Sequence, residues 1–484
     1  MLKRNSVQME LNFNGSGRNR FRSRVNEGIF QILAEVPVPG ADSKIEDAVA
    51  RLSDFQYLTE AGSDASAAGL AFTDTADDSM DPVLFASALA GDNPDFHILY
   101  LSGRGRSADR LLAAAKHAEH LGLRNLCVVS GAAPAHATAE SLSRTYFLES
   151  VNVLRILRDS GDPGMFLGAC VNPFKYTPGD STVQYAKAVR KIGCGASFFV
   201  VQYGWDMMKL QELRWQLWRR NFNIPLFARM MFLTQESASA LCSGRIPGVR
   251  VSPDLESVLK MEMRYSPAQF RAAQIRRLQL HAAGAHLLGY SGVQLSGVDQ
   301  PELFQTLLQR IHEAIREFSS FEDWVAAYRE YYARMELAPY PYRYYTFEKL
   351  FSQAQPPDEF ELRNAPVSDC TRLERFRYFL SEILFRNAAK LPAEERRLSK
   401  RLLLGCRGCE KCRVPMTFYI CPEHCPKGMA NGPCGCSRPD GSCEYTDKEC
   451  IFVRMLRLSN LLRDFVSMET GWVEQPSCRP HGSR

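Results

Sequence analysis

Nine cysteines lie within 45 residues near the C-terminus of this chain: Cys406, Cys409, Cys412, Cys421, Cys425, Cys434, Cys436, Cys443 and Cys450. Thiols at this density either bind metal or form disulfides. The run opens with Cys406-x2-Cys409-x2-Cys412, which places three sulfurs on one tight loop. Such a loop can hold one face of an iron–sulfur cluster, or part of a tetrahedral zinc site.

The rest of the chain favours metal over disulfides. The segment Met1–Arg24 is basic but has no apolar core, so it does not read as a secretory signal. No run of about 18 apolar residues occurs, so we expect no membrane span and a cytoplasmic location. Thiols stay reduced in the cytoplasm, which leaves the cysteines available for metal.

Zinc and iron–sulfur clusters both fit these ligands. Nine cysteines with His424 could build two zinc sites, whereas two [4Fe–4S] clusters need eight thiolates. The tight opening triplet and the cysteine–proline pairs at Cys421 and Cys425 favour clusters. Cys436 and Cys406 are the expected spare thiols. Outside the run we expect Cys370 and Cys478 to be free, and the remaining cysteines to be buried as small apolar residues: Cys127, Cys170, Cys194 and Cys242.

Composition describes an ordinary globular protein. The chain has 484 residues, 45% of them hydrophobic and 23% charged, which allows two or three domains. The net charge is only +5, and acidic residues are mixed with the basic ones almost everywhere along the chain. We therefore expect no nucleic-acid partner. The arginines around Phe21 are expected to form a solvated end or to cover the bottom of a barrel.

Eight short β-rich runs alternate with helical stretches such as Ala108–Leu121 and Pro267–Ala283. The runs are Phe30–Val36, Gly69–Asp74, Phe96–Leu101, Asn125–Ser130, Met165–Val171, Ser197–Gln202, Ile224–Arg229 and Gly292–Val298. This alternation predicts the α/β class and a closed (β/α)8 TIM barrel, followed by a small cysteine-rich metal-binding domain. A doubly wound open sheet is less favoured, because Glu35-Val-Pro-Val-Pro39 replaces the glycine-rich turn expected after its first strand.

The sequence divides into four parts. Residues 1–24 form a basic N-terminal segment and 25–317 the barrel. Residues 318–370 read as an aromatic and proline-rich linker that packs on the barrel. Residues 371–484 form a helical and cysteine-rich domain. In that domain we expect helices after Asp369 or Thr371 and at Pro392, and a last helix over Phe452–Val466.

In such a barrel, active sites lie at the C-terminal ends of the strands. Glu35 ends the first run in apolar surroundings, which should raise its pKa and suit a general acid. The alternative is a structural acid paired with a buried arginine. His97, at the start of the third run, is more readily a satisfied core residue than a catalyst. Other polar residues end their runs and predict a hydrogen-bonding mouth: Thr73, Asp74, Ser130, Asn172 and Gln202.

These residues resemble a known family. Arg22-x-Arg24-Val-x5-Phe30-x3-Ala34-Glu35-Val-x-x-Pro resembles the start of the methylenetetrahydrofolate reductase barrel. Leu123–Gly131, Gly168–Phe174 and Lys187–Gln202 are similar to later barrel segments of that family. The stretch from Cys421-Pro-Glu-His-Cys425 through Cys434, Cys443 and Cys450 resembles the cysteine-rich partner subunit of the acetogen-type reductase.

The resemblance implies a flavoenzyme that reduces 5,10-methylenetetrahydrofolate to 5-methyltetrahydrofolate, or runs the reverse, with FAD or FMN. It implies Glu35 as the general acid and Gln202 as a pterin contact. The implied flavin positions are Thr73, His97, Val129, Ser130, Gly131, Ala132, Asn172, Gln184, Lys187, Arg190 and Lys191. It further implies NAD(P)H or a protein as electron donor, and we expect a homo-oligomer.

One departure from the family keeps a second function open. The family commonly carries an acid beside the flavin ring, where this chain has Ala132. Losing that carboxylate should raise the flavin potential or weaken the flavin site. The alternative is therefore a non-catalytic folate-binding protein, or an iron–sulfur electron-transfer relative of the reductase.

Overall fold

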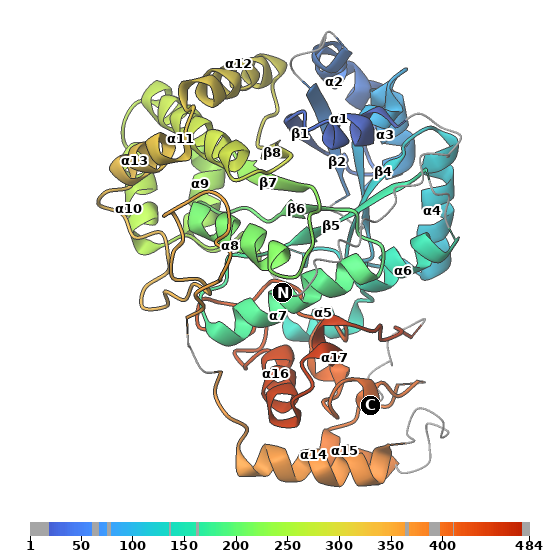
Figure 1. The fold of residues 1–484 in the computed structure, drawn as a ribbon. Helices are drawn as coiled ribbons and strands as arrows, with labels where there is room; N and C mark the ends of the chain where they lie inside the picture. Colours follow the sequence, from blue (N-terminus) through green and yellow to red (C-terminus); the bar gives the residue numbers. More distant parts are fainter. Residues whose placement is uncertain are drawn as a thin grey trace.

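The computed structural model describes residues 19–60, 67–74, 79–134, 137–160, 164–363, 367–386, 397–409 and 411–476. It confirms the predicted barrel: eight parallel strands close in chain order, each beside the next, with β8 returning to β1 (Figure 1). The strands are β1 (Gln31–Pro37), β2 (Ala67–Thr73), β3 (Ile98–Ser102), β4 (Asn125–Val129), β5 (Phe166–Val171), β6 (Phe198–Val201), β7 (Leu226–Met231) and β8 (Gly292–Ser296). Every one of them overlaps a predicted run.

The N-terminal end of the barrel is plugged by α1 (Arg20–Asn26). Phe21 is fully buried, and its ring stacks on Phe227 with 5.5 Å between centroids. Phe166 and Phe198 complete this aromatic floor. The basic N-terminal segment was expected either to be a solvated end or to cover the bottom of the barrel. For the described residues from 19 onward, the second interpretation is confirmed.

Helices form the outer ring, because their apolar faces pack on the strands. They are α2 (Ile45–Glu60), α3 (Pro82–Ala90), α4 (Ala108–His120), α6 (Ser150–Ser160), α7 (Pro178–Gly193), α8 (Met207–Trp218), α11 (Pro267–Leu287) and α12 (Pro301–Glu317). Three further helices pack outside this core: α5 (Ala139–Arg144) packs with the C-terminal domain, and α9 (Gln235–Cys242) and α10 (Pro253–Glu262) share a separate apolar cluster. The segment expected to be a linker packs on the barrel as predicted. It begins with a helix that the sequence did not indicate, α13 (Phe321–Tyr331), whose Trp324 lies in the main core.

The C-terminal domain has four helices within its described residues: α14 (Arg372–Phe385), α15 (Arg397–Leu404), α16 (Ile451–Leu462) and α17 (Val466–Glu469). Thr371 caps α14 as predicted. The expected last helix over Phe452–Val466 is present as α16, but it ends four residues early, because Arg463 adopts a left-handed conformation after Leu462. The expected start at Pro392 lies outside the described residues.

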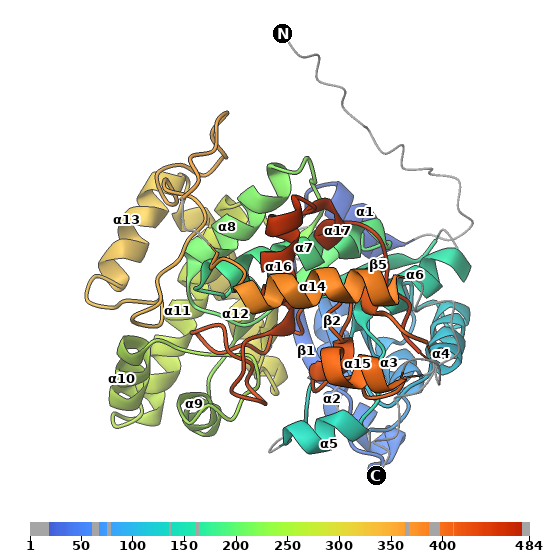
Figure 2. The same ribbon diagram turned by 90° about the horizontal axis from the view of Figure 1, so that it is seen from below.

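This domain lies across the C-terminal end of the barrel (Figure 1, Figure 2). Its α16 and α17 pack on α7 of the barrel, while α14 and α15 form the outermost layer. Apart from two short 3-10 turns, Val414–Met416 and Pro422–His424, the cysteine run is irregular. No helix in the described part of the chain is both long and apolar enough to cross a membrane.

Candidate functional site

The C-terminal ends of the strands surround a cavity of about 210 Å³. The barrel forms its floor and walls, and the C-terminal domain forms its roof through Lys427 and Pro433–Cys436. Ten of the residues assigned by resemblance line this one space: Thr73, Val129, Ser130, Gly131, Ala132, Asn172, Gln184, Lys187, Lys191 and Gln202. The barrel geometry therefore collects them as the sequence analysis expected.

Three assigned residues are placed elsewhere. His97 precedes β3, at the opposite end of the strand, where its Nδ1 accepts a hydrogen bond from the Leu70 amide at 3.0 Å. Its burial lowers the pKa of the ring to about 4, so it is a neutral core residue. Arg190 points to the C-terminal domain and donates to the Ser467 carbonyl at 2.5 Å. Glu35 is not among the residues that line the cavity.

Glu35 is bound by a partner that the sequence analysis did not name. Arg229, on β7, pairs with both of its carboxylate oxygens, with Nε 2.7 Å from Oε2. Gln294 Nε2 donates to Oε2 at 3.0 Å, and the Tyr203 hydroxyl lies 3.1 Å from the same oxygen. Burial alone would raise the pKa of Glu35, but the charge and hydrogen bonds of Arg229 hold it below its ordinary value.

The predicted upward shift of the Glu35 pKa is therefore wrong, and the alternative of a paired structural acid describes the geometry. Arg229, not Glu35, presents its side chain to the cavity. Its position as the last residue of the seventh predicted run could have marked it as a mouth residue. The role of Glu35 as a proton donor stays a prediction, and it would require Arg229 to release the carboxylate.

Two cavity groups are suited to bind a ligand. The Gln184 amide nitrogen is buried and has no hydrogen-bond partner. Lys191 donates to the Cys170 carbonyl. Burial, with the nearby Lys187 ammonium, lowers the pKa of Lys191 to about 7. An unpaired amide donor and a lysine that titrates near neutrality both suit a ligand with oxygen acceptors or negative charge.

Other barrel residues at the mouth hold the roof instead. Lys187 donates to the carbonyls of Gly432 and Pro433, both at 3.0 Å. Asn172 donates to the Gly435 carbonyl at 2.9 Å, and so does Lys175. These contacts fix the loop that closes the cavity.

A buried carboxylate adds to these contacts between barrel and roof, which together we call the latch. Glu149 is fully buried in the barrel, and it accepts hydrogen bonds from the backbone amides of Ala430 at 2.6 Å and Asn431 at 3.1 Å. The Lys187 ammonium lies 3.8 Å from the same carboxylate. The roof is thus held by charge on the barrel side and by backbone groups on its own side.

This arrangement does not fit a flavin dinucleotide. The resemblance gives Asn172, Lys187 and Arg190 to the ribityl chain, phosphates and adenosine, yet all three donate to carbonyls of the C-terminal domain. Ala132 supplies no side-chain charge, and its carbonyl accepts from Arg104 at 2.7 Å.

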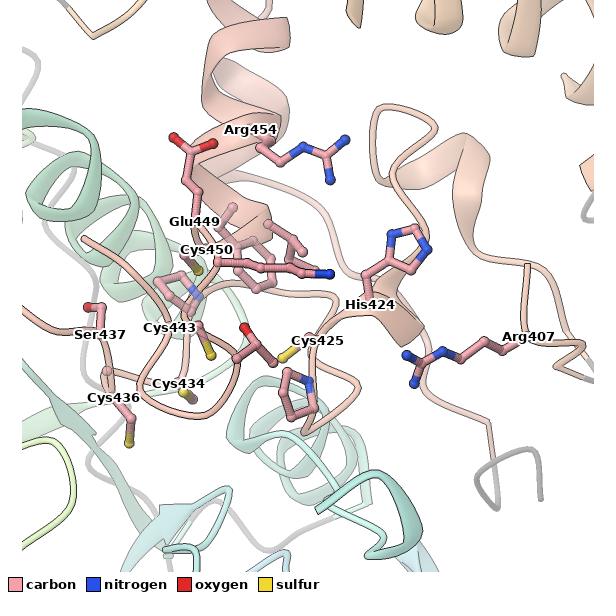
Figure 3. Close-up of a pocket in the computed structure, with 17 residues that line it drawn as sticks. Arg407, His424, Cys425, Cys434, Cys436, Ser437, Cys443, Glu449, Cys450 and Arg454 are labelled. Carbon is pink, nitrogen blue, oxygen red and sulfur yellow. The ribbon is translucent and has the colours of Figure 1, made fainter. Parts of the chain in front are cut away.

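A second cavity, of about 390 Å³, lies inside the C-terminal domain. Five cysteines line it: Cys425, Cys434, Cys436, Cys443 and Cys450 (Figure 3). Cys436, on the same loop, directs its sulfur toward the barrel (Figure 3). Pro433–Cys436 line both cavities, so one stretch of four residues separates the cysteine site from the barrel mouth.

The other four cysteines of the run form a second group: Cys406, Cys409, Cys412 and Cys421. Burial and the neighbouring Cys412 and Cys406 raise the pKa of the Cys409 thiol to about 11. Burial likewise raises the pKa of Cys421 to about 12, with Cys409 and Cys406 contributing. Because the sulfur of Cys436 points toward the barrel, the other eight cysteines of the run divide into two groups of four. That Cys436 or Cys406 is the spare thiol stays a prediction.

The cysteines outside the run can be placed in part. Among the described thiols, Cys127, Cys194 and Cys370 are buried, and Cys170 and Cys242 are half-buried. Cys478 lies outside the described residues. Within the described ranges, no three His, Cys, Asp or Glu side chains lie close enough together to share a single metal ion.

Comparison with known proteins confirms the C-terminal resemblance. Residues 386–471 match a family model described as "Methylene-tetrahydrofolate reductase C terminal". No curated protein matches the chain. Among solved structures, the chain is similar to an uncharacterized protein from Clostridium thermocellum that binds two copies of 5-methyl-5,6,7,8-tetrahydrofolic acid. The two share 13% identity and a TM-score of 0.45, over 61% of this chain and 99% of that one.

Proposed function

We propose that this protein binds a reduced folate in the barrel-mouth cavity and carries electrons in its C-terminal domain, within one-carbon metabolism. One observation carries the proposal. The segment that matches the reductase C-terminal family model, 386–471, includes the loop Pro433–Cys436 that forms the wall between the cysteine site and the cavity. A domain associated with folate reduction thus roofs the ligand site of the barrel.

The chain's own residues give the cavity its preference for such a ligand. Gln184 offers an unpaired amide donor, Lys191 a titratable ammonium, and Arg229 a guanidinium held in place by Glu35. A pterin ring carries a carbonyl and ring nitrogens that accept hydrogen bonds, and a folate tail carries carboxylates. Donors of this kind, buried in a small cavity, orient a ligand by hydrogen bonds and exclude water.

For the metal we propose [4Fe–4S] clusters at the two groups of four cysteines. A cluster would supply one-electron transfer when bound. The donors fit, because the thiols of the first group line a cavity of about 390 Å³. The tight triplet Cys406-x2-Cys409-x2-Cys412 at the start of the run supports clusters over zinc.

Two observations favour the electron-transfer reading over the flavin-dependent reductase. Arg229 keeps Glu35 ionised at neutral pH, so it holds no proton to donate to a folate nitrogen. Lys187 and Asn172, which would bind a flavin tail, hold the roof. The reductase remains the second candidate, supported by the ten assigned residues that line one cavity.

The test starts with anaerobic purification. Iron, zinc and flavin are quantified, absorption and electron paramagnetic resonance spectra are recorded, and 5-methyltetrahydrofolate is titrated calorimetrically. We expect iron without stoichiometric flavin, and folate binding that Gln184→Leu weakens about tenfold by removing one buried hydrogen bond. Gln309→Leu, at an exposed position, is the matched control. A protein that binds no folate overturns the proposal, and a stoichiometric flavin with folate turnover selects the second candidate.

A further inference from the structure

We propose that the outer face of α14 and α15 docks a small acidic electron-carrier protein. This inference rests on the proposed function, because it names the partner that would supply or take the electrons. It draws on a surface that is far from the barrel-mouth cavity: α14 and α15 form the layer of the molecule farthest from the barrel (Figure 1, Figure 2).

The outer face of α14 is apolar and uncovered by any described residue. Leu373, Phe376, Phe379 and Ile383 are 56%, 62%, 50% and 79% exposed. They recur at intervals of three and four residues, so they form one stripe along the helix. Leu402 on α15 is 84% exposed. A row of large apolar side chains left open to water marks an interaction surface.

Arginines border this stripe. Arg375 and Arg377 are exposed and flank it on opposite sides of α14, with Arg372 at its start. None of the three pairs with a described acidic residue. Of the two glutamates on the helix, Glu374 is bound by Arg457 at 2.8 Å and lies on the inner side. The face is therefore apolar at its centre and positive at its edges, which complements an acidic surface.

The position of this face over the cysteines indicates that the acidic partner would be an electron carrier. The inner face of α14, through Phe385 and Tyr378, packs in one small apolar cluster with Cys412, Cys421 and Leu404. A carrier seated on the outer face would thus lie directly over the second group of four cysteines. The first group lies between that group and the barrel, against the wall Pro433–Cys436.

A second copy of this chain is a poorer occupant. Pairing α14 with itself would bring four arginines of one copy, Arg372, Arg375, Arg377 and Arg386, against the same four of the other. Only Glu382 remains to offset them, since Glu374 already binds Arg457. Like charges across an interface oppose association. An acidic redox protein meets the same face with the opposite charge.

The experiment measures binding of a small acidic bacterial ferredoxin to the anaerobically purified full chain, at low and at high ionic strength. A basic cytochrome c serves as the comparison protein. We expect the ferredoxin to bind, to bind more weakly as salt rises, and the cytochrome to bind far less. Phe376→Ser/Ile383→Ser should weaken binding about tenfold or more. Arg375→Glu/Arg377→Glu should weaken it and flatten its salt dependence.

Matched controls carry the same changes at exposed positions on the barrel side: Met261→Ser/Tyr265→Ser and Arg264→Glu/Arg271→Glu. The inference is overturned if ferredoxin does not bind, if the α14 variants and the controls behave alike, or if the chain forms a dimer that Phe376→Ser/Ile383→Ser abolishes. A parallel titration of 5-methyltetrahydrofolate separates the two proposals. Folate binding without ferredoxin binding removes only the docking face, and the converse removes only the folate site.

Discussion

The barrel and the C-terminal domain are held together by different means. The barrel has a closed ladder of eight strands around a continuous apolar core, so its shape follows from its own backbone and side chains. The cysteine run has almost no regular structure, and its loops are fixed by Glu149, Lys175 and Lys187 of the barrel. The barrel fold therefore sets the geometry of the site by itself, whereas the conformation of the roof depends on its contacts with the barrel.

The largest effect should come from substitution of the cysteines, because bound metal would hold the roof loops, which have almost no secondary structure of their own. Cys443→Ser removes one thiol that faces the 390 Å³ cavity, whereas Cys436→Ser removes the thiol that faces the barrel. We expect the first to lose about four of eight irons per chain and the second to lose none. Iron analysis and limited proteolysis of the domain measure both. Equal iron loss in the two variants would refute the division into two groups of four.

The latch should show the next largest effect. Glu149 is fully buried beside Lys187, so Glu149→Gln leaves that ammonium without its counter-charge. We expect about 3–5 kcal/mol less stability for the docked C-terminal domain. Denaturant unfolding followed by domain-specific proteolysis should show the roof opening before the barrel unfolds. Glu140→Gln, a carboxylate that is exposed and paired with Arg144, is the control, and a similar loss there would contradict the latch.

Within the barrel, the Glu35–Arg229 pair gives a smaller effect with a defined pH dependence. The pKa of Glu35 is lowered in the folded protein, so its contribution is full above its ordinary pKa and is lost as the pH falls through the folded value. In Arg229→Met, burial should raise that pKa instead, and stability should then increase as the pH falls. We expect a loss of about 2–3 kcal/mol at neutral pH.

Denaturant unfolding across pH 4 to 8, a window that brackets the ordinary pKa of a glutamate of about 4.3, measures this reversal. Arg245→Met changes an exposed arginine that is not among the residues lining the cavity, and it should leave the pH profile of the wild type unchanged. An Arg229→Met profile parallel to the wild type would mean that Glu35 is not governed by this pair.

The same contrast explains what the sequence could predict. The strands follow from local alternation of apolar residues, so all eight were located, and Glu35 was placed at a strand end. Its partner Arg229 is 194 residues away, and no local pattern links the two. The contacts of Lys187 with the roof span 245 residues, so its use as a latch could not be distinguished from phosphate binding. Local periodicity predicts elements, whereas the charge balance of a site depends on distant pairs.

The smallest expected effect sharpens the comparison at the boundary between the two regions. Lys191 lines the cavity from the barrel side, and its pKa is lowered to about 7 by burial and by Lys187, the residue that holds the roof. An anionic folate should bind more tightly to the protonated form, so affinity should fall by up to about tenfold per pH unit as the pH rises above 7. Lys191→Met should bind with an affinity close to that of the deprotonated wild type and without this slope.

Calorimetric titration of 5-methyltetrahydrofolate between pH 6 and 9, around that pKa of about 7, measures both profiles. Lys116→Met, on the outer face of α4, should keep the wild-type slope. If Lys191→Met retains it as well, the proton that governs binding belongs to another group, and the barrel floor does not sense the charge of its ligand.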